Sequence, residues 1–183
     1  MDDLEFEEVP DDERLDYSWV TERFAVGGAI WNRTNMRRLA KAGITHIVDL
    51  QTAFDDTEIA DGMGIEVLWC PFSDDLQVKE PELFERVVGF AIAAYRQTNS
   101  RIYIHCEEGK HRSPMMLLAV LAALGMKLTE AQASIQRARP QVDFPNAYRQ
   151  SVVKFLAAYR ERNGCMFVDH GPPPAPPPTK PKR

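Results

Sequence analysis

The stretch that decides the fold of this chain is RIYIHCEEGKHRSP, residues 101–114 of 183. Residues 101–105 are rich in apolar and β-favouring side chains and predict a short buried strand. Residues 113–124 are apolar on every side, which is typical of a buried helix. Cys106 stands between the two, at the end of the strand. A buried strand that leads through a short polar loop into a buried helix indicates an α/β protein.

Helix and strand patterns alternate over the rest of the chain as well. Expected strands cover residues 17–25, 44–50 and 65–70, and expected helices cover residues 32–42, 81–97, 129–139 (with Thr129 as N-cap) and 146–162, with a helical turn at 55–61. This order predicts a single α/β domain with a central, mostly parallel sheet of four to five strands flanked by helices. Ligands of such sheets bind beyond the carboxyl ends of the strands, which is where Cys106 lies.

The two ends of the chain differ from its body in charge and composition. Residues 1–16 contain nine acidic residues and one arginine, and residues 170–183 contain three basic residues, no acid and many prolines. The body between them is neutral, since the whole chain carries −5, and nothing in it favours nucleic acid as a partner. We expect an acidic flexible arm over residues 1–16, a folded domain over residues 17–163 and a Pro-rich disordered tail over residues 164–183.

The cysteine content and the hydropathy pattern indicate the compartment. Three cysteines in a chain of this length are too few for a disulfide framework. The first residues, MDDLE, have neither the basic start nor the apolar core of a secretory signal. The longest apolar run, residues 115–124, is shorter than the ~18 residues that a membrane span needs. We therefore expect a soluble cytoplasmic protein with no membrane partner.

The loop after Cys106 has the features of an anion-binding cup. Six successive backbone N–H groups, those of residues 107–112, can curl around one point, and the following helix adds its positive end. Gly109 allows the chain to turn tightly. Arg112 offers a planar fork that matches two oxygens of a phosphate. The sequence therefore predicts a cup for a tetrahedral anion with the Cys106 sulfur at its floor.

The same surroundings favour the thiolate form of a cysteine, which is the nucleophilic form. A thiolate beneath a bound phosphate is placed for in-line attack on phosphorus. We expect Ser113 to donate a hydrogen bond to the sulfur and to help it leave, and His105 to support the loop. The alternatives are an inert core thiol or a metal site of His105 and Cys106, which is a poor fit because adjacent strand residues face opposite ways.

The segment His105-Cys106-x5-Arg112-Ser113 resembles the signature loop of the cysteine-based protein tyrosine phosphatases, and specifically their dual-specificity branch. The likeness extends to residues 24–29, 39–50 and 139–146, and covers the chain from about residue 17 to residue 162. It implies the phosphatase fold and hydrolysis through a cysteinyl-phosphate, with no metal and no cofactor. In these terms Cys106 is the nucleophile, and Arg112 binds the phosphate and stabilises the transition state.

The resemblance also implies a general acid on a separate loop, an Asp about thirty residues before the cysteine. Asp74 lies 32 residues before Cys106, directly after an expected strand, and Asp75 is the reserve. The role of Asp74 would be to protonate the leaving oxygen and then to deprotonate the attacking water. The alternative for Asp74 is a cap of the local turn. Cys70 ends an expected strand and fits the core, and a protective Cys70–Cys106 disulfide is its alternative role.

The side chains of the loop bear on the substrate. The expected substrate-binding residues are Glu107, Glu108, Gly109, Lys110, His111 and Arg112. The two glutamates put negative potential at the rim, which argues against heavily charged substrates, whereas residues 109–112 (GKHR) resemble a small group of atypical members that act on inositol pyrophosphates.

Three kinds of function therefore remain to be weighed. A phosphorylated protein, with phosphotyrosine and also phosphoserine or phosphothreonine, is the expected substrate, and an inositol phosphate or another small phosphorylated molecule is the alternative. A catalytically silent phosphate-binding module is the alternative outside enzymes. The low-molecular-weight phosphatases and arsenate reductases, which share Cys-x5-Arg, place the loop near the N-terminus and are set aside.

Overall fold

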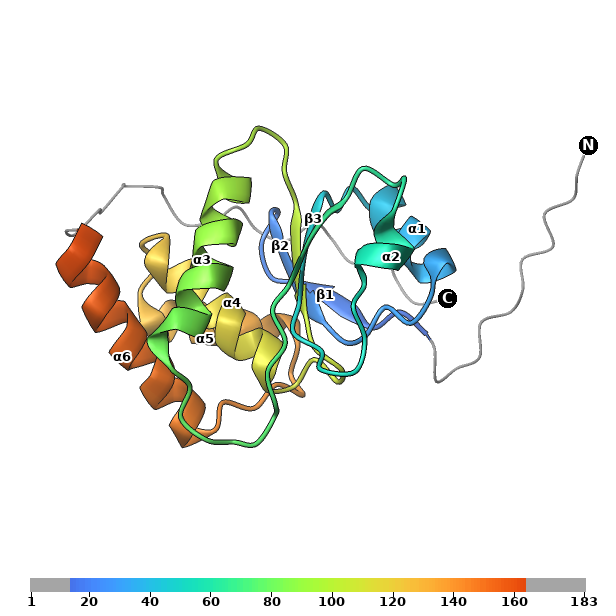
Figure 1. Cartoon of the computed structure of the whole chain (residues 1–183). Helices are drawn as coiled ribbons and strands as arrows, with labels where there is room; N and C mark the ends of the chain where they lie inside the picture. The colour runs from blue at the N-terminus through green and yellow to red at the C-terminus, as the bar shows by residue number, and fades with distance from the viewer. Residues whose placement is uncertain (1–13, 164–183) are drawn as a thin grey trace, which may run out of the picture.

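The computed structural model describes residues 14–163, which form one five-stranded sheet covered by helices on both faces (Figure 1). The strands are β1 (Tyr17–Trp19), β2 (Phe24–Gly27), β3 (His46–Asp49), β4 (Glu66–Trp69) and β5 (Ile102–His105). Their order across the sheet is β1-β2-β5-β3-β4. Only the β1–β2 pair is antiparallel, and β5, the middle strand of the five, has a parallel neighbour on each side. This confirms the expected α/β fold with a mostly parallel sheet.

Six helices connect and cover the strands in the described part of the chain. They are α1 (Arg33–Lys41), α2 (Thr57–Ala60), α3 (Pro81–Tyr95), α4 (Arg112–Ala123), α5 (Leu128–Ala138) and α6 (Asn146–Asn163). Figure 1 shows α1 and α2 on one face of the sheet and α3 to α6 on the other. Side chains of successive strand residues alternate between these layers. In β5, for example, Tyr103 packs with the α1–α2 side, whereas Ile102 and Ile104 pack with the larger layer.

Helix α4 is the centre of the larger layer. Residues 112–122 are all buried, as the apolar sequence predicts. The helix contacts α3, α5, α6 and the strands β2 and β5, so it is enclosed by neighbours from most of the domain. Its first residue, Arg112, directly follows the loop that comes from β5. The element that fills the core is therefore also the element that holds one end of the loop.

Most expected elements are found, with differences at their ends. The region expected as one β segment, residues 17–25, consists of two strands joined by a turn, in which the Thr21 hydroxyl accepts the backbone N–H groups of Arg23 and Phe24. Asn32 caps α1 by accepting the N–H of Asn35 at 2.9 Å. The expectation that Thr129 caps α5 is wrong: the helix begins one residue earlier, at Leu128, and Lys127 is at the cap.

The expected ends of the domain are only partly covered by the structure. Residues 1–13 and 164–183, which include most of the acidic arm and the Pro-rich tail, lie outside the described residues. Asp16, which we assigned to the arm, is within them. Between residues 14 and 163, no helix has both the length and the apolar character that spanning a bilayer would require.

Candidate active site

Cys106 lies at the carboxyl end of the central strand β5, and residues 106–111 form a loop, here the cysteine loop, that ends at the start of α4. The thiol is buried, with 2% of the residue exposed. The N–H of Gly109 donates to Sγ at 3.3 Å. Ser113 Oγ lies 3.4 Å from Sγ and 3.2 Å from the carbonyl oxygen of Gly27, so its one proton can be given to either acceptor. The sulfur thus has one backbone donor, and the Ser113 hydroxyl is a second group that can donate to it when it carries a negative charge.

The carbonyl groups of the cysteine loop are held from outside the cup. The bonds are Ala29 N–H to Glu107 O (2.9 Å), Arg139 Nη2 to Glu108 O (3.1 Å), Arg139 Nε to Gly109 O (2.9 Å) and Asp143 N–H to Lys110 O (3.1 Å). In a trans peptide the N–H points opposite to the C=O of the same unit. Four outward carbonyls therefore turn the N–H groups of residues 108–111 inward, which is the arrangement an oxyanion needs.

Gly109 permits this tight path. Its φ is +67°, in the region that L side chains rarely adopt. A Cβ atom built there would lie 2.4 Å from the carbonyl carbon of Gly27 and 2.8 Å from Arg139 Nη2. Neither the backbone of β2 nor the buried guanidinium has room to move away. A residue other than glycine at this position would therefore displace the loop.

The Arg112 guanidinium lies under the same site and is 5% exposed. Its Nη1 donates to the carbonyls of Leu50 (3.2 Å) and Phe72 (3.1 Å), which fixes the plane of the group. Its Nη2 is 3.8 Å from a carboxylate oxygen of Glu107, and Nε has no hydrogen-bond partner within the described residues. A buried donor without a partner is costly, and a bound anion would satisfy it.

Asp74 is brought to the mouth of the site from the segment after β4. Tyr148 Oη donates to its Oδ1 at 2.8 Å, and His111 Nδ1 lies 3.0 Å from its Oδ2, which is also 4.0 Å from Arg112 Nε. Burial, followed by the hydrogen bond to Asp74, raises the pKa of Tyr148, so its phenol remains a donor. The sequence reasoning did not identify Tyr148, because it lies 74 residues from its partner.

Asp75 is held elsewhere. It pairs with Lys79 four residues later and accepts the N–H of Gln77 at 3.0 Å. The hydrogen bond from Lys79 is the main reason why the pKa of Asp75 is lowered. Of the two adjacent carboxylates, Asp74 is therefore the one in contact with the cysteine loop.

His105 is enclosed behind the loop and contacts two buried carboxylates. Its Nε2 lies 2.8 Å from Asp56 Oδ2 and 3.7 Å from Asp49 Oδ1. The shorter contact joins the imidazole and the Asp56 carboxylate as a buried ion pair. Burial lowers the pKa of His105, but Asp56 and Asp49 together raise it by more. Burial raises the pKa of Asp49 to about 6, against the effect of the nearby His105. His105 thus lies behind the loop and outside the cup, and its supporting role stays a prediction.

The same three residues are the group with metal-ligand spacing within residues 14–163. Ligand atoms of Asp49, Asp56 and His105 lie within 4.8 Å of one another. The 2.8 Å contact between the imidazole and a carboxylate already balances charge inside the cluster. The geometry is therefore that of a buried ion pair with a second carboxyl, and it needs no ion to explain it.

The remaining loop side chains lie at the surface. Glu107 and Glu108 are exposed, and Lys110 Nζ lies 3.0 Å from a carboxylate oxygen of Glu108. Cys70 is buried and free, as is Cys106, so neither forms a disulfide in this structure. The acidic rim expected from the sequence is present, with Lys110 turned toward Glu108.

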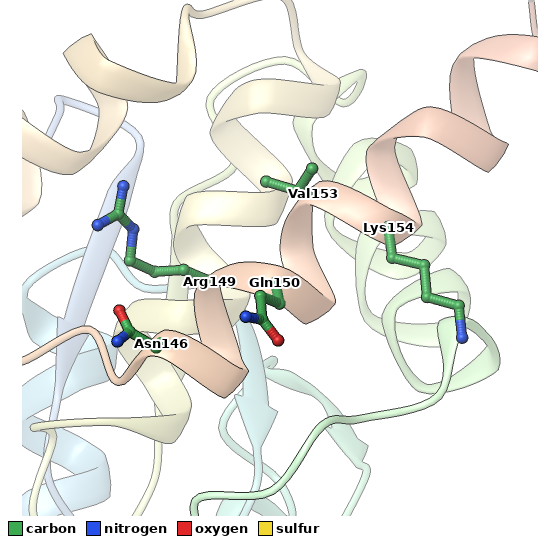
Figure 2. A pocket seen from close by; sticks show the side chains of 5 residues that line it. All are labelled: Asn146, Arg149, Gln150, Val153 and Lys154. Carbon is green, nitrogen blue, oxygen red and sulfur yellow. The ribbon is translucent and has the colours of Figure 1, made fainter.

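A separate hollow of about 390 Å³ lies on the outer face of α6 (Figure 2). Its lining side chains are Asn146, Arg149, Gln150, Val153 and Lys154, all exposed. They carry no thiol and no carboxylate, and this helix face is opposite to the buried side chains of α6. This hollow therefore lacks the groups that the chemistry expected at Cys106 would need.

Comparison with known proteins agrees with this geometry. Residues 30–162 match the family model described as the dual specificity phosphatase catalytic domain. Among solved structures, the chain resembles PTPMT1 in complex with PI(5)P, with a TM-score of 0.71 and 19% identity over 80% of this chain and 97% of that chain. It also resembles human DUSP28 (TM-score 0.69, 21% identity, 80% and 97% covered) and DUSP15 (0.68, 19%, 79% and 90%).

Proposed function

Because the chain belongs to the family of dual specificity phosphatase catalytic domains, we propose that it hydrolyses phosphomonoesters through a cysteinyl-phosphate formed on Cys106. The observation that carries the proposal is the buried thiol at the floor of a loop whose four outward carbonyls turn its N–H groups inward. The N–H of Gly109, 3.3 Å from Sγ, lowers the energy of the thiolate. Arg112 and these N–H groups would bind three oxygens of the phosphate.

In the first step the Cys106 thiolate attacks phosphorus, and the bond between phosphorus and the leaving oxygen breaks. Asp74 gives its proton to that oxygen, so that an alcohol or a phenol departs. The negative charge on the equatorial oxygens is stabilised by Arg112 and by the inward N–H groups. Tyr148 and His111 hold the Asp74 carboxyl at the mouth of the site, where the leaving group would stand.

In the second step water attacks the cysteinyl-phosphate. Asp74, now ionised, takes a proton from the water, and the bond between phosphorus and sulfur breaks. Ser113 Oγ, 3.4 Å from Sγ, donates to the departing thiolate. The products are inorganic phosphate and the starting enzyme. No metal enters either step.

We propose phosphotyrosine on protein as the substrate, with phosphoserine or phosphothreonine as further substrates. The acidic rim supports this choice, because Glu107 lies 3.8 Å from the Arg112 guanidinium and would repel a second phosphate near it. The second candidate, an inositol phosphate, is favoured by the fold likeness to PTPMT1, whose structure contains PI(5)P. A silent phosphate-binding module is disfavoured because Cys106, Arg112 and Asp74 are all present in one site.

The nucleophile is tested by hydrolysis of an aryl phosphate in the presence of a chelator. We expect turnover by the wild-type protein, none by Cys106→Ser and normal turnover by Cys70→Ser, which removes the other buried thiol. Rapid quenching of the wild-type reaction should yield protein carrying one acid-labile phosphate on the peptide that contains Cys106. Normal turnover by Cys106→Ser would remove the assignment.

The substrate is tested with a panel of phosphotyrosine peptides, phosphothreonine peptides and inositol phosphates, applied to wild type and to Glu107→Gln. We expect the highest kcat/KM for phosphotyrosine peptides. Glu107→Gln should raise kcat/KM for the inositol phosphates more than for the peptides. A higher kcat/KM for an inositol phosphate with wild type would favour the second candidate.

A further inference from the structure

Arg139, at the end of α5, is the largest fully buried side chain described, with 1% exposed. Its guanidinium makes four hydrogen bonds, and each of its nitrogens donates. Two go to the cysteine loop, from Nε to Gly109 O (2.9 Å) and from Nη2 to Glu108 O (3.1 Å). The other two go to the carboxylate of Asp16, from Nη1 to Oδ1 (2.9 Å) and from Nη2 to Oδ2 (2.6 Å). Arg139 therefore contacts the loop on its carbonyl side and does not line the cup.

From this geometry we infer that Arg139 is a positioning residue that keeps the cysteine loop in its anion-binding form, and that Asp16 in turn holds Arg139. The inference rests on the proposed function only in that the cysteine loop is taken to bind an oxyanion. It names two residues outside the cup as determinants of how well the cup binds that oxyanion.

The physical reason lies in the two peptide units that Arg139 fixes. The carbonyls of Glu108 and Gly109 belong to the same units as the N–H groups of Gly109 and Lys110. If either carbonyl turned inward, the cup would have an acceptor in place of a donor. The negative end of that peptide dipole would then face the anion. Two hydrogen bonds from a buried cation, each stronger than a neutral one, oppose such a rotation.

Asp16 supplies the charge that makes a buried arginine tolerable. A buried guanidinium without a counter-ion would be strongly destabilising. The hydrogen bond to Arg139 is the main reason why the pKa of Asp16 is lowered, although the partial loss of solvent around the carboxyl opposes it. The backbone of Asp16 is also fixed, because its carbonyl accepts the N–H of Gly28 at 2.9 Å. Asp16 thus ties the start of β1 to the loop.

A different contact supports the same coupling. The residue before Gly28, Gly27, accepts Ser113 Oγ at 3.2 Å and the N–H of Cys106 at 3.4 Å through its carbonyl. The end of β2 therefore contacts the first residue of the cysteine loop and the first turn of α4. Asp16, whose carbonyl pairs with Gly28 after β2, contacts the middle of the cysteine loop through Arg139. The Asp16–Arg139 pair, here the brace, thus holds the cysteine loop against the β1–β2 hairpin.

The test measures oxyanion binding without turnover. In the full chain carrying Cys106→Ser, tungstate binding is measured by calorimetry for this background and for the added changes Asp16→Asn and Arg139→Lys. Loss of one charge-assisted hydrogen bond should weaken tungstate binding about tenfold in Asp16→Asn. Arg139→Lys loses the planar guanidinium that contacts both the loop carbonyls and Asp16, so it should weaken tungstate binding about a hundredfold or more. Arg137→Lys is the matched control, because Arg137 is exposed on the same helix and donates to Ser134; it should leave binding unchanged.

A merely structural role would lower the melting temperature and leave tungstate affinity unchanged in the folded protein, and this result would overturn the inference. Asp16→Asn is the milder change and keeps the test decisive if Arg139→Lys fails to fold, because asparagine retains an oxygen that can accept from Arg139 and the Asp16 side chain is 63% exposed to water. Absence of tungstate binding in the Cys106→Ser background would also overturn it. If tungstate binds and depends on Asp16 and Arg139, but wild type hydrolyses no phosphomonoester, the inference stands and the proposed function fails.

Discussion

At the scale of single residues, the neighbours Asp74 and Asp75 show how position decides chemistry. Both are carboxylates on the same segment, but Asp74 meets Tyr148 and His111, whereas Asp75 meets Lys79. A general acid must reach the leaving oxygen, and a carboxylate paired with lysine is held as an anion. These contacts support our proposal that Asp74, and not Asp75, is the general acid.

We predict that Asp74→Asn lowers kcat by about 10²- to 10⁴-fold for phenyl phosphate, whose leaving group needs a proton. The loss should be much smaller for a nitrophenyl phosphate, whose leaving group departs as an anion. Steady-state kinetics with both substrates measure the difference. Asp75→Asn is the matched control and should change neither rate by more than a few fold. If Asp75→Asn gave the larger loss for phenyl phosphate, the acid would have to be reassigned.

The buried carboxyl of Asp49 predicts a pH dependence of stability. Burial raises its pKa from 3.8 to about 6 in the folded protein. Between these values the folded state keeps a proton that the unfolded chain has released, so the free energy of unfolding falls as the pH rises. In Asp49→Asn this contribution is absent. Its stability should depend on pH less steeply between about pH 4 and 6, by up to about 1.4 kcal/mol per pH unit.

Urea denaturation at several pH values measures this slope. Asp61→Asn, at an exposed carboxyl that ends α2, is the control and should keep the wild-type slope. The raised pKa of His105 acts in the same direction, since it also binds its proton more tightly in the folded protein, but its effect falls at higher pH. Equal slopes in Asp49→Asn and wild type between pH 4 and 6 would contradict the assignment of a raised pKa to Asp49.

At the scale of elements, the strand–loop–helix unit around Cys106 depends on the backbone of Gly109. We predict that Gly109→Ala abolishes tungstate binding in the Cys106→Ser background. The positive φ alone would cost about 1–2 kcal/mol, and the added methyl would also meet Gly27 at 2.4 Å. Gly89→Ala is the control, because Gly89 lies within α3 with open space around a built Cβ. It should not weaken binding, and alanine should stabilise the helix slightly.

This unit also shows how far the sequence alone could lead. The strand, the cysteine and the buried helix were predicted because each depends on local pattern within residues 101–124. Arg139 and Tyr148 were missed as site residues because they act over 30 and 74 residues, through contacts that no local pattern reveals. The N-cap at Thr129 was wrong for a related reason: Leu128 packs against the larger core, and the helix extends to include it.

Asp16 shows the same limit at the end of the domain. Its acidic neighbours favoured assigning it to an arm. Its contact with Arg139, 123 residues away, ties it to the folded part. The charge pattern of a segment therefore predicted where the composition changes, but not which acid of the segment has a buried partner.

At the scale of the whole molecule, the core and the candidate site share α4. Arg112 and Ser113 form its first turn, and the residues that follow fill the centre of the larger layer. The cysteine loop and the core should therefore unfold together, because the first turn of α4 cannot leave its place without opening the larger layer that the rest of α4 fills. Loss of anion binding and loss of secondary structure should follow one transition.

Leu117→Ala tests this coupling. Leu117 is fully buried in α4, so the substitution should lower the free energy of unfolding by about 2–5 kcal/mol through lost burial and a new cavity. Val153→Ala is the control, at a side chain 53% exposed on α6, and should cost less than about 0.5 kcal/mol. We expect turnover of the Leu117→Ala protein to match wild type at temperatures well below its melting point. On heating, turnover and the circular dichroism signal should then be lost together. A separate, earlier loss of turnover would mean that the cysteine loop opens independently of α4, and that the brace from Arg139, rather than the core, limits its stability.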